Sequence, residues 1–242
     1  DGAVWVNLYA TAPPPAAEPA AAVQTVAVTA VATPAKVSLS FAWATPVGAA
    51  VFRRGEAVWV VFDAPARLDM PGEGQLGPAS EARWIAGPDH IAVRIVAPEG
   101  LAVSAVAQGA AWTVNIGGQP VAVQGVAIDR QVDGEPALVA RMAGATRAVW
   151  LTDPLVGDRF AAVTALAPGK GFADRRRTVD LALLLTAQGL AVETPADDLA
   201  IQADGDLVTL SRPGGLTLSP PSAGLDAAAA GDSAPQRARH PA

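Results

Sequence analysis

Histidine is the side chain best suited to acid–base chemistry near neutral pH, and the chain contains two, His90 and His240. His90 follows Asp89 and could act as a base, but its position just after Gly87 and Pro88 favours a turn residue that precedes a strand. There is no cysteine, which excludes a thiol nucleophile, a disulfide and a thiolate metal site. A catalytic triad would need His90, because His240 lies in a predicted tail, so we expect no catalytic residues.

Acidic side chains form two clusters along the sequence. The first surrounds Gly134 and consists of Asp129, Asp133 and Glu135. It superficially resembles a calcium loop, but the ligand spacing of a helix-loop-helix site is absent, so we expect a solvated hairpin turn. The second consists of Asp197, Asp198, Asp204 and Asp206. Paired carboxylates can cleave a glycosidic bond, which would make the protein a glycan-active hydrolase, but aspartates in turns usually bond the local backbone. We expect no metal, no cofactor and no enzymatic activity.

Basic side chains supply the candidate partner-binding residues. One group consists of Lys170, Arg175, Arg176 and Arg177. It predicts a local cationic patch that could bind an acidic partner or a cell-wall polymer, or could simply end a solvated loop. A second group, Arg53 and Arg54, has the aromatic neighbours Phe52 and Trp59, which could stack on a sugar ring. Core packing is the favoured interpretation of Trp59, because its predicted strand is apolar on both sides.

The overall charge argues against nucleic acid as a partner. Lysine and arginine number 17 against 23 aspartates and glutamates, for a formal net charge of -6, so no global cationic field is available to hold a phosphate backbone. The longest uncharged stretch, residues 100–128, is interrupted by glutamines, by Pro120 and by several glycines. We interpret this stretch as sheet, and we expect a protein that does not span a membrane.

Residues 48–63 indicate how the rest of the chain is built. Two β-type runs, residues 49–53 and 57–62, flank Arg54-Gly55-Glu56, where glycine permits a tight reversal of the backbone. The second run is apolar on both faces, which predicts a central strand covered on both sides. Residues 36–43 alternate between apolar and polar side chains and predict an amphipathic strand.

Comparable units of a strand, a glycine turn and a further alternating run recur along the chain, with turns at Gly2, Gly109, Gly144 and Gly205. The chain has 23 glycines and 21 prolines, a composition typical of many short strands separated by turns. We predict an all-β protein of repeated antiparallel hairpins that form one extended or two adjoining β-sandwich-like units. A β-propeller or β-solenoid is the alternative, since repeated hairpins also build those folds.

The chain divides into five predicted segments. Residues 1–9 predict an N-terminal strand, and residues 10–35 a linker rich in proline and alanine, within which the valine-rich stretch 24–32 could form a strand. Residues 36–128 and 129–219 are the two predicted β units. Residues 220–242 have no apolar face to bury and are predicted to be disordered or a linker.

Three stretches carry a resemblance to a known class of protein. They are residues 47–63 (Val-Gly-Ala-Ala-Val-Phe-Arg-Arg-Gly-Glu-Ala-Val-Trp-Val-Val-Phe-Asp), Thr152-Asp153-Pro154 to Gly157-Asp158-Arg159, and Gly189-Leu190-Ala191-Val192 to Arg212-Pro213-Gly214-Gly215-Leu216. Together they resemble the β-rich amino-terminal region of large exported alphaproteobacterial proteins that carry tetratricopeptide repeats. The hairpin alone is similar to AMIN-type domains, β-sandwich modules of the bacterial envelope that bind peptidoglycan or envelope machinery. These motifs are structural, so the resemblance implies no catalytic residues.

These observations predict a non-enzymatic exported scaffold or adaptor that binds proteins of the bacterial cell envelope through exposed sheet edges or loops. The alternative is a peptidoglycan- or carbohydrate-binding β-sandwich module that uses tryptophan and arginine side chains. The chain begins at Asp1 without a recognisable signal peptide. It is therefore either a processed mature protein or a fragment of a longer one, and we favour a periplasmic or otherwise exported protein whose signal has been removed.

Overall fold

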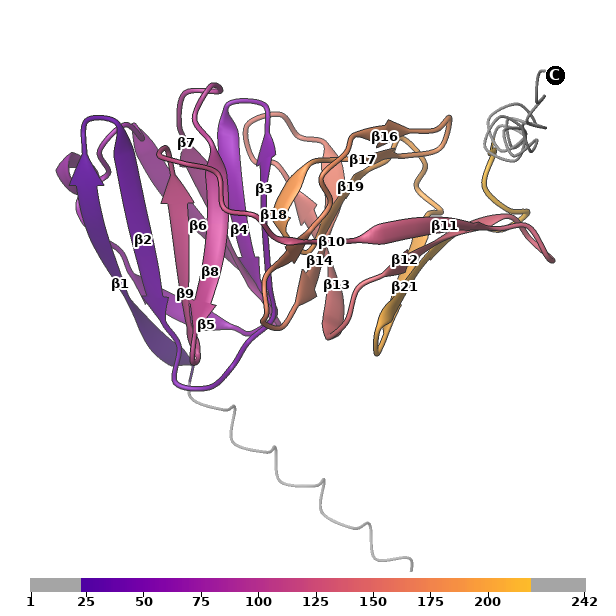
Figure 1. The fold of residues 1–242 in the computed structure, drawn as a ribbon, viewed down its shortest axis with the longest axis horizontal. Coiled ribbons are helices and arrows are strands. Elements are labelled where there is room, and N and C mark those ends of the chain that lie inside the picture. Colours follow the sequence, from indigo (N-terminus) through magenta and orange to yellow (C-terminus); the bar gives the residue numbers. More distant parts are fainter. Residues whose placement is uncertain (1–22, 219–242) are drawn as a thin grey trace, which may run out of the picture.

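Residues 23–218, the part of the chain that the computed structural model describes, form four stacked layers of β-sheet (Figure 1). The helical segment in this part is a single 3-10 turn, η1 (Glu73–Gln75). No helix among the described residues has the length and apolar character needed to cross a membrane. The predicted strand at residues 1–9, the first part of the predicted linker and the predicted tail at 220–242 lie outside the described residues.

The first outer layer is a five-stranded sheet at the left of Figure 1. Its strands follow the order β5 (Ala66–Asp69), β1 (Gln24–Thr33), β2 (Lys36–Ala42), β9 (Ala111–Ile116) and β8 (Val103–Gln108). Neighbours pair antiparallel, except β1 and β5, which pair parallel. The predicted amphipathic strand is confirmed in β2, where Val37, Leu39 and Phe41 are buried and the residues between them are not.

The two inner layers are the halves of one large sheet. The first half consists of β6 (Glu81–Ala86), β7 (Ile91–Val96), β4 (Ala57–Phe62) and β3 (Ala49–Arg54). The second half has β14 (Arg159–Ala165) at its centre, with β13 (Ala145–Thr152) on one side and β19 (Leu190–Glu193), β17 (Ala182–Leu183) and β16 (Arg176–Arg177) on the other. The halves join where Ala49 pairs with Ala165 and where β18 (Thr186–Gln188) pairs with β3.

The second outer layer is a four-stranded antiparallel sheet at the right of Figure 1. Its strands follow the order β11 (Ala127–Gln131), β12 (Ala137–Arg141), β21 (Leu207–Ser211) and β20 (Ala200–Asp204). The chain reaches this sheet through β10 (Gln124–Gly125), which pairs in parallel with β15 (Lys170–Gly171).

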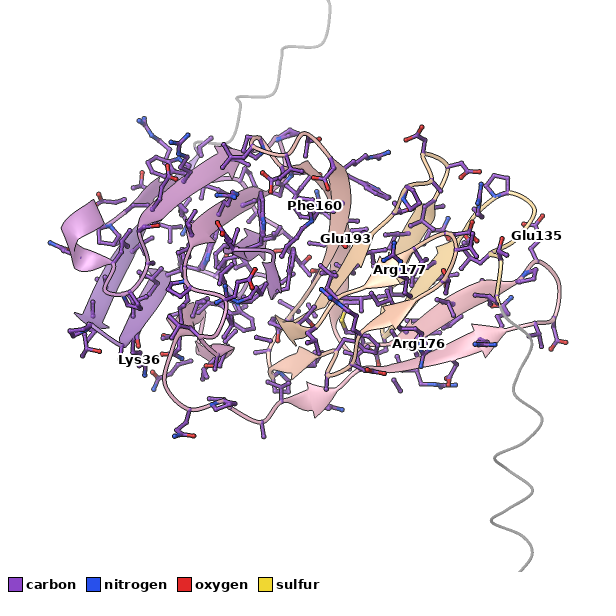
Figure 2. The ribbon with its side chains drawn as sticks, turned by 90° about the horizontal axis from the view of Figure 1, so that it is seen from above. Lys36, Glu135, Phe160, Arg176, Arg177 and Glu193 are labelled. Atoms are coloured by element: carbon purple, nitrogen blue, oxygen red, sulfur yellow. The ribbon has the colours of Figure 1, made fainter. Side chains whose placement is uncertain are left out.

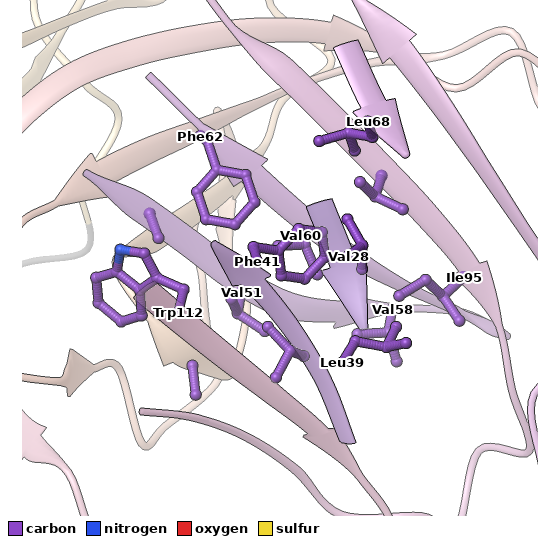
Figure 3. Packing of buried hydrophobic residues seen from close by; sticks show 14 of the residues in the cluster. Val28, Leu39, Phe41, Val51, Val58, Val60, Phe62, Leu68, Ile95 and Trp112 are labelled. Carbon is purple, nitrogen blue, oxygen red and sulfur yellow. The ribbon is translucent and has the colours of Figure 1, made fainter. Parts of the chain in front are cut away.

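The first sandwich buries a core rich in aromatic side chains between the first outer sheet and the first inner half-sheet (Figure 3). Phe41 and Trp43 pack against Phe62, with ring centroids 5.0 and 5.1 Å apart. Trp112 is 2% exposed, and its indole N–H donates to the carbonyl oxygen of Val47 at 3.0 Å. Large rings on both facing sheets therefore fill this core.

The second sandwich buries a mainly aliphatic core between the second outer sheet and the second inner half-sheet. Leu138 and Leu210 on the outer sheet face Val163 and Leu190 on the inner one. The buried aromatic side chain of this core is Phe172. Smaller side chains allow closer approach but bury less apolar area per residue.

The two inner half-sheets pack against each other through a third core. Phe160 on β14 contacts Trp59 and Phe52 of the hairpin that β3 and β4 form, with ring centroids 4.8 and 6.0 Å apart. All six residues of β4 are buried, alternately in the first and third cores. The prediction of a central strand covered on both faces is confirmed, and Trp59 is a fully buried core residue.

Glycine is required where the halves of the inner sheet meet. Gly189 has a φ of 70°, in the left-handed region that favours glycine. A Cβ at this position would lie 2.4 Å from the carbonyl oxygen of Val163 and 3.1 Å from that of Ala49. The backbones of β14, β3 and the β18–β19 turn can therefore approach this closely only without a side chain between them.

The predicted all-β fold is confirmed in the form of two adjoining sandwiches, but two of its boundaries differ. Residues 24–33 are not linker but form β1, as the valine-rich stretch 24–32 allowed, because Val26 and Val28 alternate with exposed residues and enter the first core. The predicted boundary between residues 128 and 129 falls inside β11. The sandwiches share the inner sheet, so each predicted β unit contributes strands to a sheet that belongs to both.

Candidate functional site

A hollow of about 350 Å³ lies at the end of the second inner half-sheet, where β14, β16, β17 and β19 begin or end. Strand pairing places Arg177, Ala182, Glu193 and Phe160 in one row across these strands, and Figure 2 shows Phe160, Glu193 and Arg177 one after another. Residues directly opposite each other share a face of the sheet. The short side chain of Ala182, between two long ones, leaves room for the hollow.

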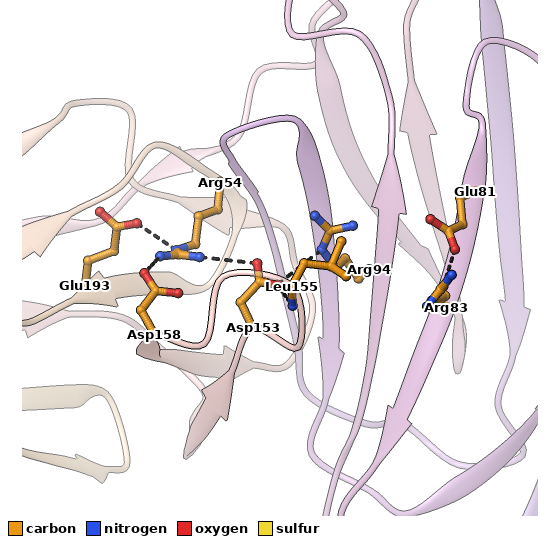
Figure 4. Close-up of polar contacts among 8 residues, drawn as sticks. All are labelled: Arg54, Glu81, Arg83, Arg94, Asp153, Leu155, Asp158 and Glu193. Carbon is orange, nitrogen blue, oxygen red and sulfur yellow. Dashed lines mark hydrogen bonds and ion pairs between the residues drawn. The ribbon is translucent and has the colours of Figure 1, made fainter.

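Arg54, at the end of β3, closes one side of the hollow and binds three carboxylates (Figure 4). Its Nε donates to Glu193 Oε1 at 2.7 Å, its Nη1 donates to Asp153 Oδ2 at 3.3 Å, and its Nη2 donates to Asp158. The guanidinium also lies 4.9 Å from the centre of the Phe160 ring. The side chain is 12% exposed. Arg54 therefore links the two inner half-sheets, and its charge is neutralised within the protein.

Asp153 is the buried member of this cluster. Its Oδ1 accepts the backbone N–H of Leu155 at 2.9 Å and lies 3.6 Å from Arg94 Nε (Figure 4). Its carbonyl oxygen accepts the N–H of Gly157 at 2.7 Å. A buried carboxylate is tolerated only when cations and donors surround it. The cluster around Arg54 and Asp153 is therefore a structural joint rather than an open binding site.

Arg159 and Arg177, on the rest of the rim, differ from Arg54. Arg159 lies 3.9 Å over the ring of Trp150, and Arg177 is exposed. Neither forms an ion pair with another residue of the described part of the chain. Val179, next to them on the wall, is 74% exposed. The carboxylates of Glu193 and Asp158 also line the hollow, but both bind Arg54. Arg159 and Arg177 are therefore the rim cations that remain for a carboxylate or another anion that carries an apolar neighbour.

Arg53 points to the opposite side of the hairpin and is occupied by the backbone. Its Nη1 donates to the carbonyl oxygen of Ala97 at 2.9 Å and its Nη2 to that of Leu101 at 3.1 Å. Burial lowers the pKa of Arg53, and the nearby Glu99 carboxylate opposes this shift. The side chain therefore fixes the loop between β7 and β8.

Lys170 is 3% exposed, although the sequence predicted it in a surface patch. Its Nζ donates to the carbonyl oxygen of Leu166 at 2.6 Å. Burial lowers the pKa of Lys170, and the charge of Asp206 opposes this shift. Because the ammonium points into the protein, Lys170 is not within reach of a partner on the surface.

The predicted run of three arginines divides among different roles. Arg175 is exposed and lies outside the hollow. Arg176 Nη1 donates to the carbonyl oxygen of Ile128 at 3.1 Å and so connects β16 to the second outer sheet. Arg177 lines the hollow. The structure does not bring the six predicted residues together on one surface, and the two that line the hollow are Arg54 and Arg177.

Three of the other groups considered for chemistry, His90, Asp89 and Asp129, take part in contacts within the protein. His90 Nδ1 lies 2.9 Å from Asp89 Oδ1, and Arg147 on β13 also contacts Asp89. The hydrogen bond with His90, followed by the charge and hydrogen bond of Arg147, lowers the pKa of Asp89. Asp129 pairs with Arg141 at 2.8 Å. Within residues 23–218, His, Asp and Glu side chains form no group of three or more that could hold a metal ion.

The sequence did not indicate Arg159 as a member of the site or Arg54 as the centre of an ion cluster. Arg54 and Glu193 are separated by 139 positions, so no local spacing links them. Arg159 has a weak local signal, since it directly precedes the apolar run that forms β14. Only the meeting of the two inner half-sheets brings these side chains to one place.

Comparisons of the chain with protein-family models, with curated proteins and with solved structures find no match in any of the three. The resemblance to exported tetratricopeptide-repeat proteins and to AMIN-type domains stays a prediction. The function is therefore argued from the hollow and its surroundings.

Proposed function

We propose that this protein is a non-enzymatic adaptor module of the bacterial cell envelope, and that it binds an acidic segment of a partner protein at the hollow. The supporting observation is the contrast between Arg54, which is neutralised internally, and Arg159 and Arg177, which have no carboxylate partner within residues 23–218. An aspartate or glutamate that entered the hollow would bind Arg177, while Arg159, one residue before Phe160 and therefore directed to the other face of the sheet, lines the hollow from that face. An aliphatic neighbour of that residue would contact Val179.

The free energy expected from hydrogen bonds at the rim fits reversible binding of the partner. A hydrogen bond to a charged group contributes about 1.5–3 kcal/mol, so the rim alone supports modest affinity. Charges at a rim mainly accelerate association and make it sensitive to salt. Binding at this site should therefore weaken steeply as the ionic strength rises.

Peptidoglycan is the second candidate ligand, because its peptide stems also carry free carboxylates that the arginine rim could bind. Stacking of a sugar ring on Trp59, which the sequence left open, has no support because this side chain is completely buried. A role for Arg53 in sugar binding is also unsupported, since its guanidinium is occupied by two carbonyl oxygens. In one candidate ligand the carboxylates belong to peptidoglycan, and in the other they belong to an acidic segment of a partner protein.

Fluorescence anisotropy with a fluorescein-labelled decapeptide of glutamate, alanine and valine tests the proposal. We expect Arg177→Ala to weaken peptide binding about tenfold, which corresponds to about 1.4 kcal/mol. The matched control is Arg175→Ala, an exposed arginine two positions away and outside the hollow, which should bind like the wild type. Equal weakening by both substitutions, or no binding by the wild type, would contradict the proposal.

Co-sedimentation with isolated sacculi separates the two candidates. Under the leading proposal, the sacculi retain little of the protein and Arg177→Ala changes this little. Strong retention that Arg177→Ala abolishes, together with no binding of the peptide, would favour peptidoglycan as the ligand.

A further inference from the structure

Strand β6 is one edge of the inner sheet, and β16, beside the hollow, is at the other end of the strand order. Among the described strands, β6 pairs only with β7. The pairing runs without a bulge over six residues. Edge strands are usually protected by proline, charged side chains or a bulge; β6 has no proline and no bulge, and its two charged residues, Glu81 and Arg83, pair with each other. Trp84, in the middle of this strand, is 48% exposed.

The direction of the backbone groups of β6 follows from two hydrogen bonds. Gly87 donates to the carbonyl oxygen of His90 at 2.9 Å, and Ala97 on the far side of β7 donates to that of Glu56 at 3.0 Å. Because antiparallel strands alternate the side to which successive residues bond, the even-numbered residues of β7 bond β6 and the odd-numbered ones bond β4. The register then directs the N–H and C=O groups of three β6 residues away from β7: Ala82, Trp84 and Ala86.

These outward groups have no partner within the described residues. Strand β6 has no second neighbour in the sheet, and no hydrogen bond outside the strand pairing uses the backbone of these three residues. Trp84 lies opposite Val93, whose side chain enters the first core, so both side chains lie on the face of the inner sheet that is turned towards the first outer sheet. Trp84 remains half exposed there, at the rim of the first sandwich.

We propose that β6 pairs with β6 of a second copy of this chain, antiparallel, about a two-fold axis at Trp84. In this register Ala82 lies opposite Ala86 of the second copy, and Trp84 lies opposite its own counterpart. Every outward N–H then meets an outward C=O, so the edge is complementary to itself. The inner sheets of two molecules would become one continuous sheet, and the two indole rings would cover each other.

Neighbouring registers are less favourable. An axis at Arg83 would place this arginine opposite the same residue of the second copy, and like charges in that position are destabilising. An axis at Ile85 would place Ala82 opposite Pro88, which has no N–H to donate. With the axis at Trp84, Arg83 lies opposite Ile85 of the second copy and keeps its ion pair with Glu81 (Figure 4).

Single-cysteine crosslinking tests the register directly, because the native chain contains no cysteine. Directly opposite residues in a hydrogen-bonded antiparallel pair have Cα atoms about 5.5 Å apart, a separation that a disulfide can bridge. We expect Trp84→Cys to form a disulfide-linked dimer under mild oxidation at least about tenfold faster than the control Ala82→Cys, whose counterparts lie about four residues apart along the strand. Equal rates for the two variants would overturn the proposal.

Sedimentation equilibrium of chains without cysteine gives the second readout. The wild type should show a concentration-dependent monomer–dimer equilibrium. Ala82→Pro removes one outward N–H and leaves the pairing with β7 intact, so it should weaken the dimer at least about tenfold, since symmetry removes two hydrogen bonds. The control Ala82→Ser keeps the N–H and should dimerise like the wild type.

A wild type that stays monomeric up to millimolar concentration would overturn the proposal. So would an Ala82→Pro variant that dimerises normally while its circular dichroism spectrum matches the wild type. If Ala82→Pro does not fold, the crosslinking rates decide. The peptide-binding experiment at the hollow is independent of these results, because β6 and the hollow lie at opposite ends of the strand order.

Discussion

The two sandwiches are held together in different ways. The first consists of strands of four to ten residues, and rings such as Trp112 and Phe62 fill its core. In the second, β15, β16 and β17 are two residues long and the core is mainly aliphatic. Regular strand pairing supplies hydrogen bonds to the backbone N–H and C=O groups of the first sandwich. In the second sandwich, many of these groups need hydrogen-bond partners other than a neighbouring strand.

Buried polar side chains supply the missing hydrogen bonds in the second region. Gln188 is completely buried; its Oε1 accepts the N–H of Lys170 at 2.9 Å and its Nε2 donates to the carbonyl oxygen of Ala165 at 2.8 Å. Thr186 Oγ1 accepts the N–H of Phe172 at 2.8 Å and donates to the carbonyl oxygen of Gly189 at 2.7 Å.

This difference has a consequence for where a binding site can form. Long, regular strands leave few backbone irregularities in which a hollow could lie. Where strands are short, side chains replace the hydrogen bonds of the ladder, and the backbone is free to curve around Arg177 and Ala182. The candidate site therefore lies in the region where buried side chains such as Gln188 and Thr186 replace part of the hydrogen-bond ladder between strands.

The largest expected effect tests the packing of the first sandwich. Trp112→Ala removes a ring that is 2% exposed and leaves a cavity among aromatic neighbours. We expect the free energy of unfolding to fall by about 4 kcal/mol, measured by denaturant titration. The control Val31→Ala, at a side chain 74% exposed in the same sandwich, should change it by less than about 0.5 kcal/mol. If Trp112→Ala lowered the free energy of unfolding only slightly, aromatic packing would not be what distinguishes the first sandwich from the second.

A smaller effect is expected for the hydrogen bonds of the second region. Gln188→Ala leaves the N–H of Lys170 and the carbonyl oxygen of Ala165 buried without a partner. We expect a loss of about 2–3 kcal/mol in the free energy of unfolding. Gln202→Ala, at an exposed glutamine of β20, is the matched control and should have almost no effect. If both substitutions had the same small effect, side-chain hydrogen bonds would not be what stabilises this region.

The smallest effect depends on pH and concerns Asp180. Its Oδ2 accepts the N–H of Thr217 at 2.5 Å and Oδ1 accepts a hydrogen bond from Arg212; the backbone hydrogen bond is the main reason that the pKa of Asp180 is lowered. Because the folded-state pKa lies below the unfolded one, the stabilisation is complete above the ordinary carboxyl pKa of about 4 and is lost as the pH falls through the folded-state value.

Asp180→Asn should therefore reduce the free energy of unfolding by about 1 kcal/mol at neutral pH. The difference from the wild type should shrink as the pH falls below about 4. Thermal unfolding of both proteins across this pH range measures it. A deficit that does not change with pH would show that the charge of Asp180 contributes nothing.

The sequence predicted the strands of the first sandwich well, because periodicity of two dominates there. In β2 and β4 the burial of Phe41 and Trp59 follows from local alternation or from an unbroken apolar run. In the second region, residues 178–186 are divided among β17, β18 and the segments around them. Hydrogen bonds such as that of Thr186 to Phe172 determine these breaks, and they join residues that no pattern of hydrophobicity relates.

The site was predictable only in part. Charge alone indicates an exposed side chain, which holds for Arg177 but fails for Lys170, whose ammonium finds a carbonyl oxygen in the interior. Arg54 is surrounded by carboxylates 99, 104 and 139 positions away. Such pairings arise from tertiary packing, so the sequence cannot distinguish an arginine that holds the protein together from one that is free to bind a ligand.

The inner sheet imposes a limit on how this chain can be divided. Its strands come from residues 49–96 and from residues 145–193, and Trp59 of the first stretch packs on Phe160 of the second. A cut in the connecting segment would expose one wall of the third core on each fragment, and neither wall could be covered by its own chain. The two sandwiches should therefore melt in a single transition, and fragments ending near residue 128 should aggregate unless both are expressed together.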